Sequence, residues 1–435
     1  MRTSIGRLVK SATLFSILTL LQHAGGQTLS KDDREYGREM LRDVKNAIKK
    51  NYYDPGFHGV NLDETFDAAD EKIKHATSNG QVFGIIAKAV RSLNDSHTNF
   101  VAPLRVLKVD YDWHILMIGD HCYIVAIKPG SDAEAKGLKP GDILHVVDGY
   151  KITRENFVDF NYLYEELQPK TSLSLVVQSP NEQPRKIEFN ASTLRDSRSI
   201  APSDLIREDF EYRRLNAHDS KIYGDGLCIW KMPRFDLTQK QVNDFVEQAN
   251  KTKTLILDLR GNLGGDPQTL LKLIGNLFDH DIKIGETRNR SETTALVART
   301  RGHNVFNGQL ILLVDSGSGS AAELLARVVQ IEKRGTVIGD HTAGSVGIAK
   351  EYWFSLNQRH AVFYGVTVTE ASIVMTDGQT LEHIGVIPDK LMLLTGSDLR
   401  DGADPVLSYA ASLAGVKLEP REAGALFPIR WKVKP

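Results

Sequence analysis

Two short, almost continuously apolar runs, 255–259 and 310–314, constrain the fold of this chain more than any other feature. Each is followed by a glycine-rich turn and then by a stretch patterned as a helix, at 267–278 and 321–332. Such runs are typical of parallel strands that are buried on both faces of a sheet. With a further strand expected at 336–339, they complete two strand–helix–strand crossover units. The sequence therefore predicts an α/β core in the second half of the chain.

The first half of the chain changes character twice before this core begins. Residues 27–101 are predicted to be helical, and Ser30 with Asp33 has the pattern of a capping box at the start of the first helix. Residues 102–192 instead contain short strand-like runs separated by turn signals. We therefore expect a helical N-terminal region, an inserted domain of strands, and an α/β core over 193–435.

Composition excludes several classes of partner. The chain has 435 residues, a net charge of -1 and no charge block, so no field of one sign exists to attract nucleic acid or an anionic membrane. Its two cysteines, Cys122 and Cys228, lie far apart in apolar strand-like runs and have no metal-ligand spacing. Two free, buried thiols are expected, although an exported protein could pair them. Neither a metal nor a cofactor is predicted.

The N-terminus has the pattern of an export signal. Arg2, Arg7 and Lys10 precede a short apolar stretch at 12–21, and small residues at 24–26 follow. This order predicts a signal peptide over residues 1–26 and a periplasmic or secreted mature protein. An uncleaved membrane anchor is the alternative, but the apolar stretch is short for a bilayer.

A serine lies at the turn between the second apolar run and its helix. The segment 317–323 reads GSGSAAE, and Ser320 directly precedes the helical pattern. A serine at such a turn exposes its hydroxyl beside the unpaired first amides of the helix, which suit a developing oxyanion. The structural alternative is a helix N-cap that follows a flexible loop.

Five pieces of the chain, taken in order, form one pattern. Residues 102–192 form the second piece, because their strand, short helix, GLKPGD turn and strand ending in Asp-Gly resemble a PDZ domain. The other four pieces are 93–98 (LNDSHT), 260–265 (RGNLGG), 320–323 (SAAE) and 381–389 (LEHIGVIPD). Together the five pieces resemble the tricorn and carboxyl-terminal-processing serine peptidase family. The resemblance covers essentially the whole mature chain and implies a crotonase-like (ClpP-like) α/β peptidase core. A PDZ groove binds an extended peptide as an additional strand.

The residue at position 345 distinguishes two catalytic branches of this family. The carboxyl-terminal-processing branch has a lysine there, in a T-F-G-K type loop, and a glutamine four residues later. Here the loop ends in Ser345, and Ala349 replaces the glutamine. Lys350 is nearby, but a shift of five residues along an expected strand changes its face and its reach. The sequence therefore argues against a serine–lysine dyad.

The tricorn branch implies a tetrad of Ser320, His97, Ser96 and Glu382. In that resemblance Ser320 is the nucleophile, His97 is its base, Ser96 contacts the histidine and Glu382 orients the serine. The chemistry is coherent because a serine hydroxyl needs a base, and histidine titrates in the appropriate range. Taken singly, these residues also fit a helix cap, a loop histidine, a turn serine and a surface glutamate.

Two further sets of residues complete the expected site. His341 and His383 lie in the same motifs and are rival bases to His97. The oxyanion hole is expected to use the amide of Ala321, with a second amide from Gly264 or Gly265.

Three functions are compatible with this pattern, and the first is preferred. The chain is expected to be an exported serine peptidase that acts on unfolded or extended polypeptide, and an oligomer is compatible with it. A catalytically inactive member that binds a hydrophobic ligand or peptide is the second reading. The interphotoreceptor retinoid-binding proteins resemble the same core and also have a T-A-G loop, as at 342–344. The third reading is an adaptor that works through its PDZ-like segment.

Overall fold

The computed structural model describes residues 29–103, 107–195, 211, 213–356 and 362–432. The signal peptide expected over residues 1–26 lies outside the described residues. Within these described ranges, no helix has the length and apolar character that a membrane crossing requires.

A six-stranded sheet forms the centre of the core, in the order β10-β11-β12-β15-β16-β19. Its neighbouring strands run parallel, except that β10 is antiparallel to β11. The two apolar runs of the sequence become β12 and β15, and they are direct neighbours at the centre of this sheet. The strands are β10 (Asp219–Tyr223), β11 (Leu227–Lys231), β12 (Thr254–Asp258), β15 (Gln309–Val314), β16 (Gly335–Gly339) and β19 (Lys390–Leu391).

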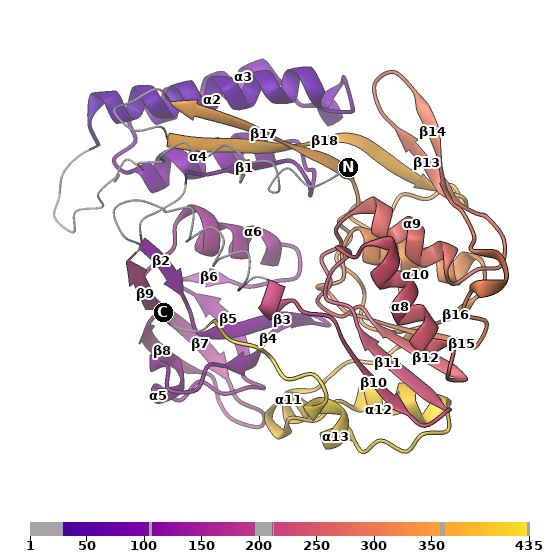
Figure 1. Ribbon diagram of the computed structural model, residues 1–435. Helices are drawn as coiled ribbons and strands as arrows, with labels where there is room; N and C mark the ends of the chain where they lie inside the picture. Colours follow the sequence, from indigo (N-terminus) through magenta and orange to yellow (C-terminus); the bar gives the residue numbers. More distant parts are fainter. Residues whose placement is uncertain (1–28, 104–106, 196–210, 212, 357–361, 433–435) are drawn as a thin grey trace.

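Helices cover both faces of this sheet, which explains why its central strands β12 and β15 are almost continuously apolar (Figure 1). Leu257 of β12 faces a cluster with α8, α9 and α10, whereas Ile256 faces a cluster with α12 and α13. The predicted α/β core with parallel crossovers is confirmed. The helices are α8 (Gln239–Ala249), α9 (Pro267–Gly275), α10 (Ala321–Ile331), α11 (Gly396–Asp401), α12 (Pro405–Leu413) and α13 (Pro420–Ala425).

The N-terminal helices pack on a second sheet, and four of its five strands come from the second half of the chain (Figure 1). Ser30 and Asp33 form the predicted capping box of α2. The strand hairpins of this sheet were not predicted, so the N-terminal region is less self-contained than the sequence suggests. The elements are α2 (Lys31–Asn51), η1 (Phe57–Gly59), α3 (Leu62–Ile73), α4 (Asn79–Arg91), β1 (Asn99–Val101), β13 (Ile282–Arg288), β14 (Thr293–Ala298), β17 (Ile348–Leu356) and β18 (Val362–Met375).

The inserted segment forms a separate sheet with its own apolar cluster, which we call the inserted module (residues 107–195). Its strands run in the order β3-β4-β5-β7-β8, with β6 paired to β5, and the β2–β9 ribbon brings its two ends together. The elements are β2 (Leu107–Asp110), β3 (Trp113–Ile118), β4 (His121–Ile127), α5 (Asp132–Ala135), β5 (Ile143–Val147), β6 (Tyr150–Lys151), α6 (Phe157–Asn161), η2 (Tyr162–Leu167), β7 (Ser172–Gln178), β8 (Arg185–Asn190) and β9 (Ser192–Arg195).

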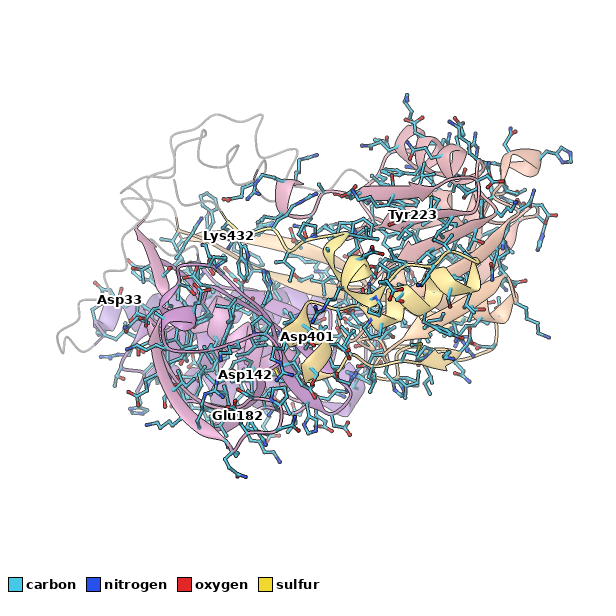
Figure 2. The ribbon with its side chains drawn as sticks, turned by 90° about the horizontal axis from the view of Figure 1, so that it is seen from below. Asp33, Asp142, Glu182, Tyr223, Asp401 and Lys432 are labelled. Carbon is cyan, nitrogen blue, oxygen red and sulfur yellow. The ribbon has the colours of Figure 1, made fainter. Side chains whose placement is uncertain are left out.

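The inserted module contacts the core at loops that belong to the candidate site. Arg154 forms an ion pair with Asp340 at 2.6 Å, and the Ser316 hydroxyl donates to the Met117 carbonyl. The C-terminal segment also returns to this module, where the rings of Trp431 and His114 have centroids 4.6 Å apart. Figure 2 shows this segment running past Asp401 to Lys432 beside the module.

Both cysteines are buried and unpaired, in different sheets. Cys122 lies in β4 of the inserted module and Cys228 in β11 of the core. Burial raises the pKa of Cys122 to about 12 and that of Cys228 to about 11. Neither thiol is therefore a nucleophile near neutral pH.

Candidate active site

Ser320 occupies a strained turn between β15 and α10. Its φ of 53° and ψ of -116° place it in a region that side-chain-bearing residues rarely adopt. Its N–H points back into the protein, toward the Ser345 carbonyl at 2.8 Å and the Glu323 carboxylate at 3.0 Å. A serine on a sharp strand-to-helix turn is the arrangement of known nucleophilic serines.

The buried carboxylate of Glu323 ties this turn to the loop at 342–345. Glu323 has no exposed surface. It accepts hydrogen bonds from Ser320 N at 3.0 Å, Gly344 N at 2.7 Å, Ser345 N at 2.9 Å and Thr342 Oγ1 at 2.5 Å. Burial raises the pKa of Glu323, and these four hydrogen bonds oppose that rise. The turn at Ser320 and the 342–345 loop are therefore held in one arrangement.

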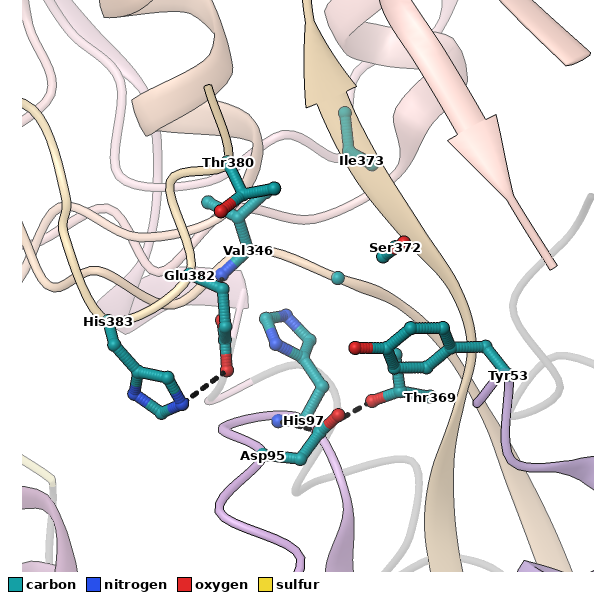
Figure 3. Close-up of a pocket in the computed structure, with 11 residues that line it drawn as sticks. Tyr53, Asp95, His97, Val346, Thr369, Ser372, Ile373, Thr380, Glu382 and His383 are labelled. Carbon is teal, nitrogen blue, oxygen red and sulfur yellow. Dashed lines mark hydrogen bonds and ion pairs between the residues drawn. The ribbon is translucent and has the colours of Figure 1, made fainter. Parts of the chain in front are cut away.

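His97, Ser96 and Glu382 form a continuous hydrogen-bonded relay. The Ser96 hydroxyl lies 2.8 Å from His97 Nδ1 and 2.8 Å from Glu382 Oε2. The Ser96 N–H also donates to Glu382 Oε1 at 2.8 Å. Figure 3 shows the His97 ring between the Glu382 carboxylate and Tyr53. Ser96 and Glu382 are 286 positions apart in sequence, and the fold links them and His97 by hydrogen bonds.

Asp95 holds the backbone that presents this relay. Its carboxylate accepts from the N–H groups of His97 and Thr98, at 2.9 and 2.8 Å, and from the Thr369 hydroxyl at 2.6 Å. The Tyr52 hydroxyl donates to its other oxygen at 3.0 Å. Asp95 is 6% exposed, so these donors satisfy a carboxylate that has little access to water.

The surroundings of His97 favour its neutral form. Burial lowers the pKa of His97 below its ordinary value of 6.5, and the nearby carboxylates of Glu382 and Asp95 oppose this shift. A neutral imidazole near pH 7 is able to accept a proton. A pocket of about 190 Å³ lies beside the ring, lined by side chains that include Tyr53, Thr369 and Thr380.

Ser320 joins this relay through the backbone rather than through a direct side-chain contact. Among the described residues, no hydrogen bond connects the Ser320 hydroxyl with His97. Instead Ser345 accepts from Ser320 N–H through its carbonyl, and its hydroxyl donates to Ser96 Oγ at 3.0 Å. Catalytic hydrogen bonds are often long in a site without substrate and shorten when substrate binds.

Gly264 of the 260–265 loop lies against Ser320. A Cβ added to Gly264 would lie 2.6 Å from Ser320 Cβ and 3.0 Å from Ala321 N. The Gly264 N–H donates to Asn262 Oδ1 at 2.8 Å. In the described part of the chain, the amides of Gly265 and Ala321 have no acceptor. Of the two glycines named from sequence, Gly264 therefore has its amide bound by an acceptor, whereas Gly265 has no acceptor among the described residues.

The rival bases and the nearby lysine lie elsewhere. His383 is exposed, and its Nε2 lies 2.8 Å from the Asn94 carbonyl and 3.5 Å from Glu382 Oε1. The His341 side chain is also exposed. Lys350 lies in β17, with its ammonium 5.5 Å from the centre of the Tyr352 ring. None of the three has a hydrogen bond to Ser96 or Ser320 among the described residues.

Sequence reasoning missed three residues that build the site. Asp95 and Glu323 were noted only as letters within motifs, and Ser345 only as the replacement for a lysine. A buried carboxylate is not recognisable from sequence, because acidic residues are usually exposed. The position of Ser345 in a loop otherwise typical of the family was the one available signal.

Comparisons with known proteins agree with the resemblance. Residues 227–392 match the model of Peptidase family S41. Carboxyl-terminal-processing peptidase 3, chloroplastic, of Arabidopsis thaliana is 23% identical over 366 residues, covering 80% of this chain and 67% of that protein. A carboxyl-terminal-processing protease of Synechocystis sp. is 26% identical over 298 residues, covering 67% of this chain and 64% of that protein.

A solved structure has the same fold over most of the chain. The crystal structure of mature CPAF aligns with a TM-score of 0.65 and 14% sequence identity. The alignment covers 84% of this chain and 94% of that one.

Proposed function

We propose that this chain, whose residues 227–392 match the model of Peptidase family S41, is an exported serine-type peptidase that uses a Ser320–His97–Ser96–Glu382 tetrad. Its substrates are polypeptides, and we infer that they are unfolded or extended chains cleaved through an acyl-enzyme. The relay of His97, Ser96 and Glu382, with both hydrogen bonds at 2.8 Å, is the observation that carries this proposal.

The hydrogen bonds of the relay define the proton positions that the reaction needs. Ionised Glu382 has no proton to donate, so the Ser96 hydroxyl donates to it. His97 Nδ1 then donates its own proton to Ser96 Oγ. This tautomer leaves His97 Nε2 with a free lone pair, which accepts the proton of Ser320 as the serine attacks.

The reaction then follows the general course of acyl transfer. Ser320 Oγ bonds to the carbonyl carbon of the substrate, and the oxyanion that forms is bound by the amides of Ala321 and Gly265. His97 returns its proton to the leaving amine, and the peptide bond breaks. Water, activated by His97 in the same way, hydrolyses the acyl-enzyme and restores the Ser320 hydroxyl.

The serine at position 345 supports this branch of the family. Ser345 occupies the position of the lysine, and Lys350 contacts the Tyr352 ring on β17. The predicted signal peptide over residues 1–26 supports export. The resemblance of residues 102–192 to a PDZ domain supports binding of extended peptide, because a PDZ domain adds a peptide as a strand at the edge of its sheet.

Substitution of the nucleophile tests the proposal. The purified protein is expected to degrade casein and to be labelled by a fluorophosphonate, and Ser320→Ala should lose both activities. Ser412→Ala is the matched control, because Ser412 lies at the exposed end of α12 and hydrogen-bonds only locally, to the Tyr409 carbonyl. Turnover of casein that is equal in the wild type and Ser320→Ala would refute the tetrad.

A further inference from the structure

Ser345 connects the nucleophile turn with the base relay. Its carbonyl accepts from Ser320 N–H at 2.8 Å, and its N–H donates to Glu323 at 2.9 Å. Its hydroxyl donates to Ser96 Oγ at 3.0 Å. We propose that Ser345 is a positioning residue whose hydroxyl fixes Ser96, and through Ser96 the His97 tautomer that acts as base. The inference rests on the proposed function of the tetrad.

The hydrogen-bond capacity of Ser96 explains this role. A hydroxyl has one proton and two lone pairs, and Ser96 Oγ has three polar neighbours in His97, Glu382 and Ser345. Ser96 donates its proton in a hydrogen bond to the Glu382 carboxylate, so both lone pairs of Ser96 Oγ are available to accept hydrogen bonds. Ser345 fills one lone pair and leaves the other for Nδ1–H of His97. Every donor and acceptor at Ser96 is then used, and its hydroxyl has a single favourable rotamer.

The loop around Ser345 is shaped to present this hydroxyl. The preceding residue, Gly344, has a φ of 67° and donates its N–H to Glu323. The next residue, Val346, donates its N–H to Glu382 Oε2 at 2.7 Å. Gly347 lies against the His97 ring, since an added Cβ would be 3.5 Å from Cγ and Nδ1. Backbone contacts on both sides of Ser345 therefore fix where its side chain points.

The side chain and the backbone of Ser345 make different hydrogen bonds, so a substitution can remove one set and keep the other. The bonds to Ser320 and Glu323 use main-chain atoms and remain in Ser345→Ala, whereas the bond to Ser96 is lost. Ser345→Thr keeps a hydroxyl at the same position. The two variants therefore test the hydroxyl without removing the loop.

Steady-state kinetics is the first test, with a fluorogenic peptide and the full chain. Loss of one neutral hydrogen bond corresponds to about a three- to tenfold decrease, which is expected in the kcat of Ser345→Ala with KM unchanged. Ser345→Thr should restore kcat to within about twofold. The variant Ser412→Ala controls for the serine-to-alanine change, because Ser412 lies outside the site.

The pH profile separates positioning from packing. Without Ser345 Oγ, water enters beside Ser96 and His97, and the smaller desolvation raises the pKa of His97. The acid limb of kcat/KM should therefore move to higher pH in Ser345→Ala and stay in place in Ser345→Thr. Unchanged kcat in Ser345→Ala would overturn the inference. Loss of activity in both variants with an unmoved acid limb would also overturn it.

Nitrogen-15 NMR of the imidazoles tests the same inference without any turnover. His97 signals are assigned by their loss in His97→Gln, and the wild type should show Nδ1 protonated and Nε2 unprotonated. Ser345→Ala should show averaging between the two tautomers. An inactive wild type with this spectrum would refute the proposed function and leave the positioning role supported. Identical spectra in wild type and Ser345→Ala would overturn the positioning role.

Discussion

At the scale of single residues, hydroxyl groups take the place of charged groups in this site. Glu382 reaches the imidazole through Ser96, and Ser345 stands where the related branch has a lysine. A hydroxyl both donates and accepts, so its direction depends on its neighbours. Here Ser96 donates to the Glu382 carboxylate and accepts from Ser345, which leaves one lone pair of Ser96 toward His97 Nδ1.

The charge state of His97 predicts the pH dependence of activity. Burial lowers its pKa below 6.5, so the acid limb of kcat/KM should have its midpoint below pH 6.5. The measurement is kcat/KM for a fluorogenic peptide between about pH 4.5 and 9. A single limb with its midpoint above pH 8 would instead indicate an amine base.

The lowered pKa of His97 also determines whether stability rises or falls with pH. Because the pKa of His97 is lower in the folded protein, the unfolded chain binds more protons as the pH falls through 6.5. The contribution of neutral His97 to stability is therefore present above pH 6.5 and is lost on acidification. In thermal unfolding, His97→Gln should reduce the acid destabilisation of the wild type.

At the scale of elements, two strand–turn–helix units are packed turn against turn. The turn after β12 and the turn after β15 touch, because Gly319 N–H donates to the Asn262 carbonyl at 2.8 Å. Asn262 is fully buried, and its side chain donates to the Met232 carbonyl at 2.7 Å. Neighbouring parallel strands bring these turns to the same edge of the sheet.

The contact between the turns predicts that Gly264 tolerates no side chain. In Gly264→Ala the added Cβ would lie 2.6 Å from Ser320 Cβ, so Ser320 or the 260–265 loop must move. A displacement near 1 Å costs about 100-fold in rate, which is the decrease expected in kcat.

A second glycine in the same loop provides the control for this experiment. Gly261 also has a positive φ, of 72°, but an added Cβ would meet no atom within 4 Å. Gly261→Ala should therefore cost about 1–2 kcal/mol of stability, as backbone strain alone does, with kcat close to the wild type. Equal kcat values for the two variants would contradict the assignment of Gly264 to the site.

At the scale of the whole molecule, parts that are distant in sequence complete one another. Strand β18 carries residues of the N-terminal cluster at Tyr364 and of the core cluster at Ile373. The inserted module contacts the nucleophile turn at Ser316 and the approach to the 342–345 loop at Asp340. The candidate site therefore lies where all three parts of the chain meet.

The ion pair of Arg154 and Asp340 predicts a measurable contribution of the inserted module to stability. Arg154 also donates to the Gly119 carbonyl, and the Asp340 side chain is 8% exposed. Arg154→Ala leaves that carboxylate with fewer donors, and we expect a loss of about 1–3 kcal/mol in thermal unfolding. Lys186→Ala is the control, because its ion pair with Glu188 is exposed at both ends. An equal loss in the two variants would contradict this role.

Local patterns predicted much of the fold. Some features depend only on residues close together in sequence, so the sequence predicts them. They are the apolar runs at β12 and β15, the capping box at Ser30 and the turn at Ser320. Strand β18 was not predicted, and two of its partners, β1 and β13, are remote from it in sequence. Strand pairing between distant segments leaves little local signal.

The sequence by itself determined the parallel core, the serine turn and, through its motifs, which residues to consider as a tetrad. The tertiary structure decided which of them share hydrogen bonds: Ser96, His97 and Glu382 do, and Ser320 is joined to them through Ser345. The physical reason is the range of the interactions. Apolar periodicity and turn chemistry act between near neighbours, whereas a hydrogen bond requires atoms within about 3 Å, a distance that the folded chain alone sets.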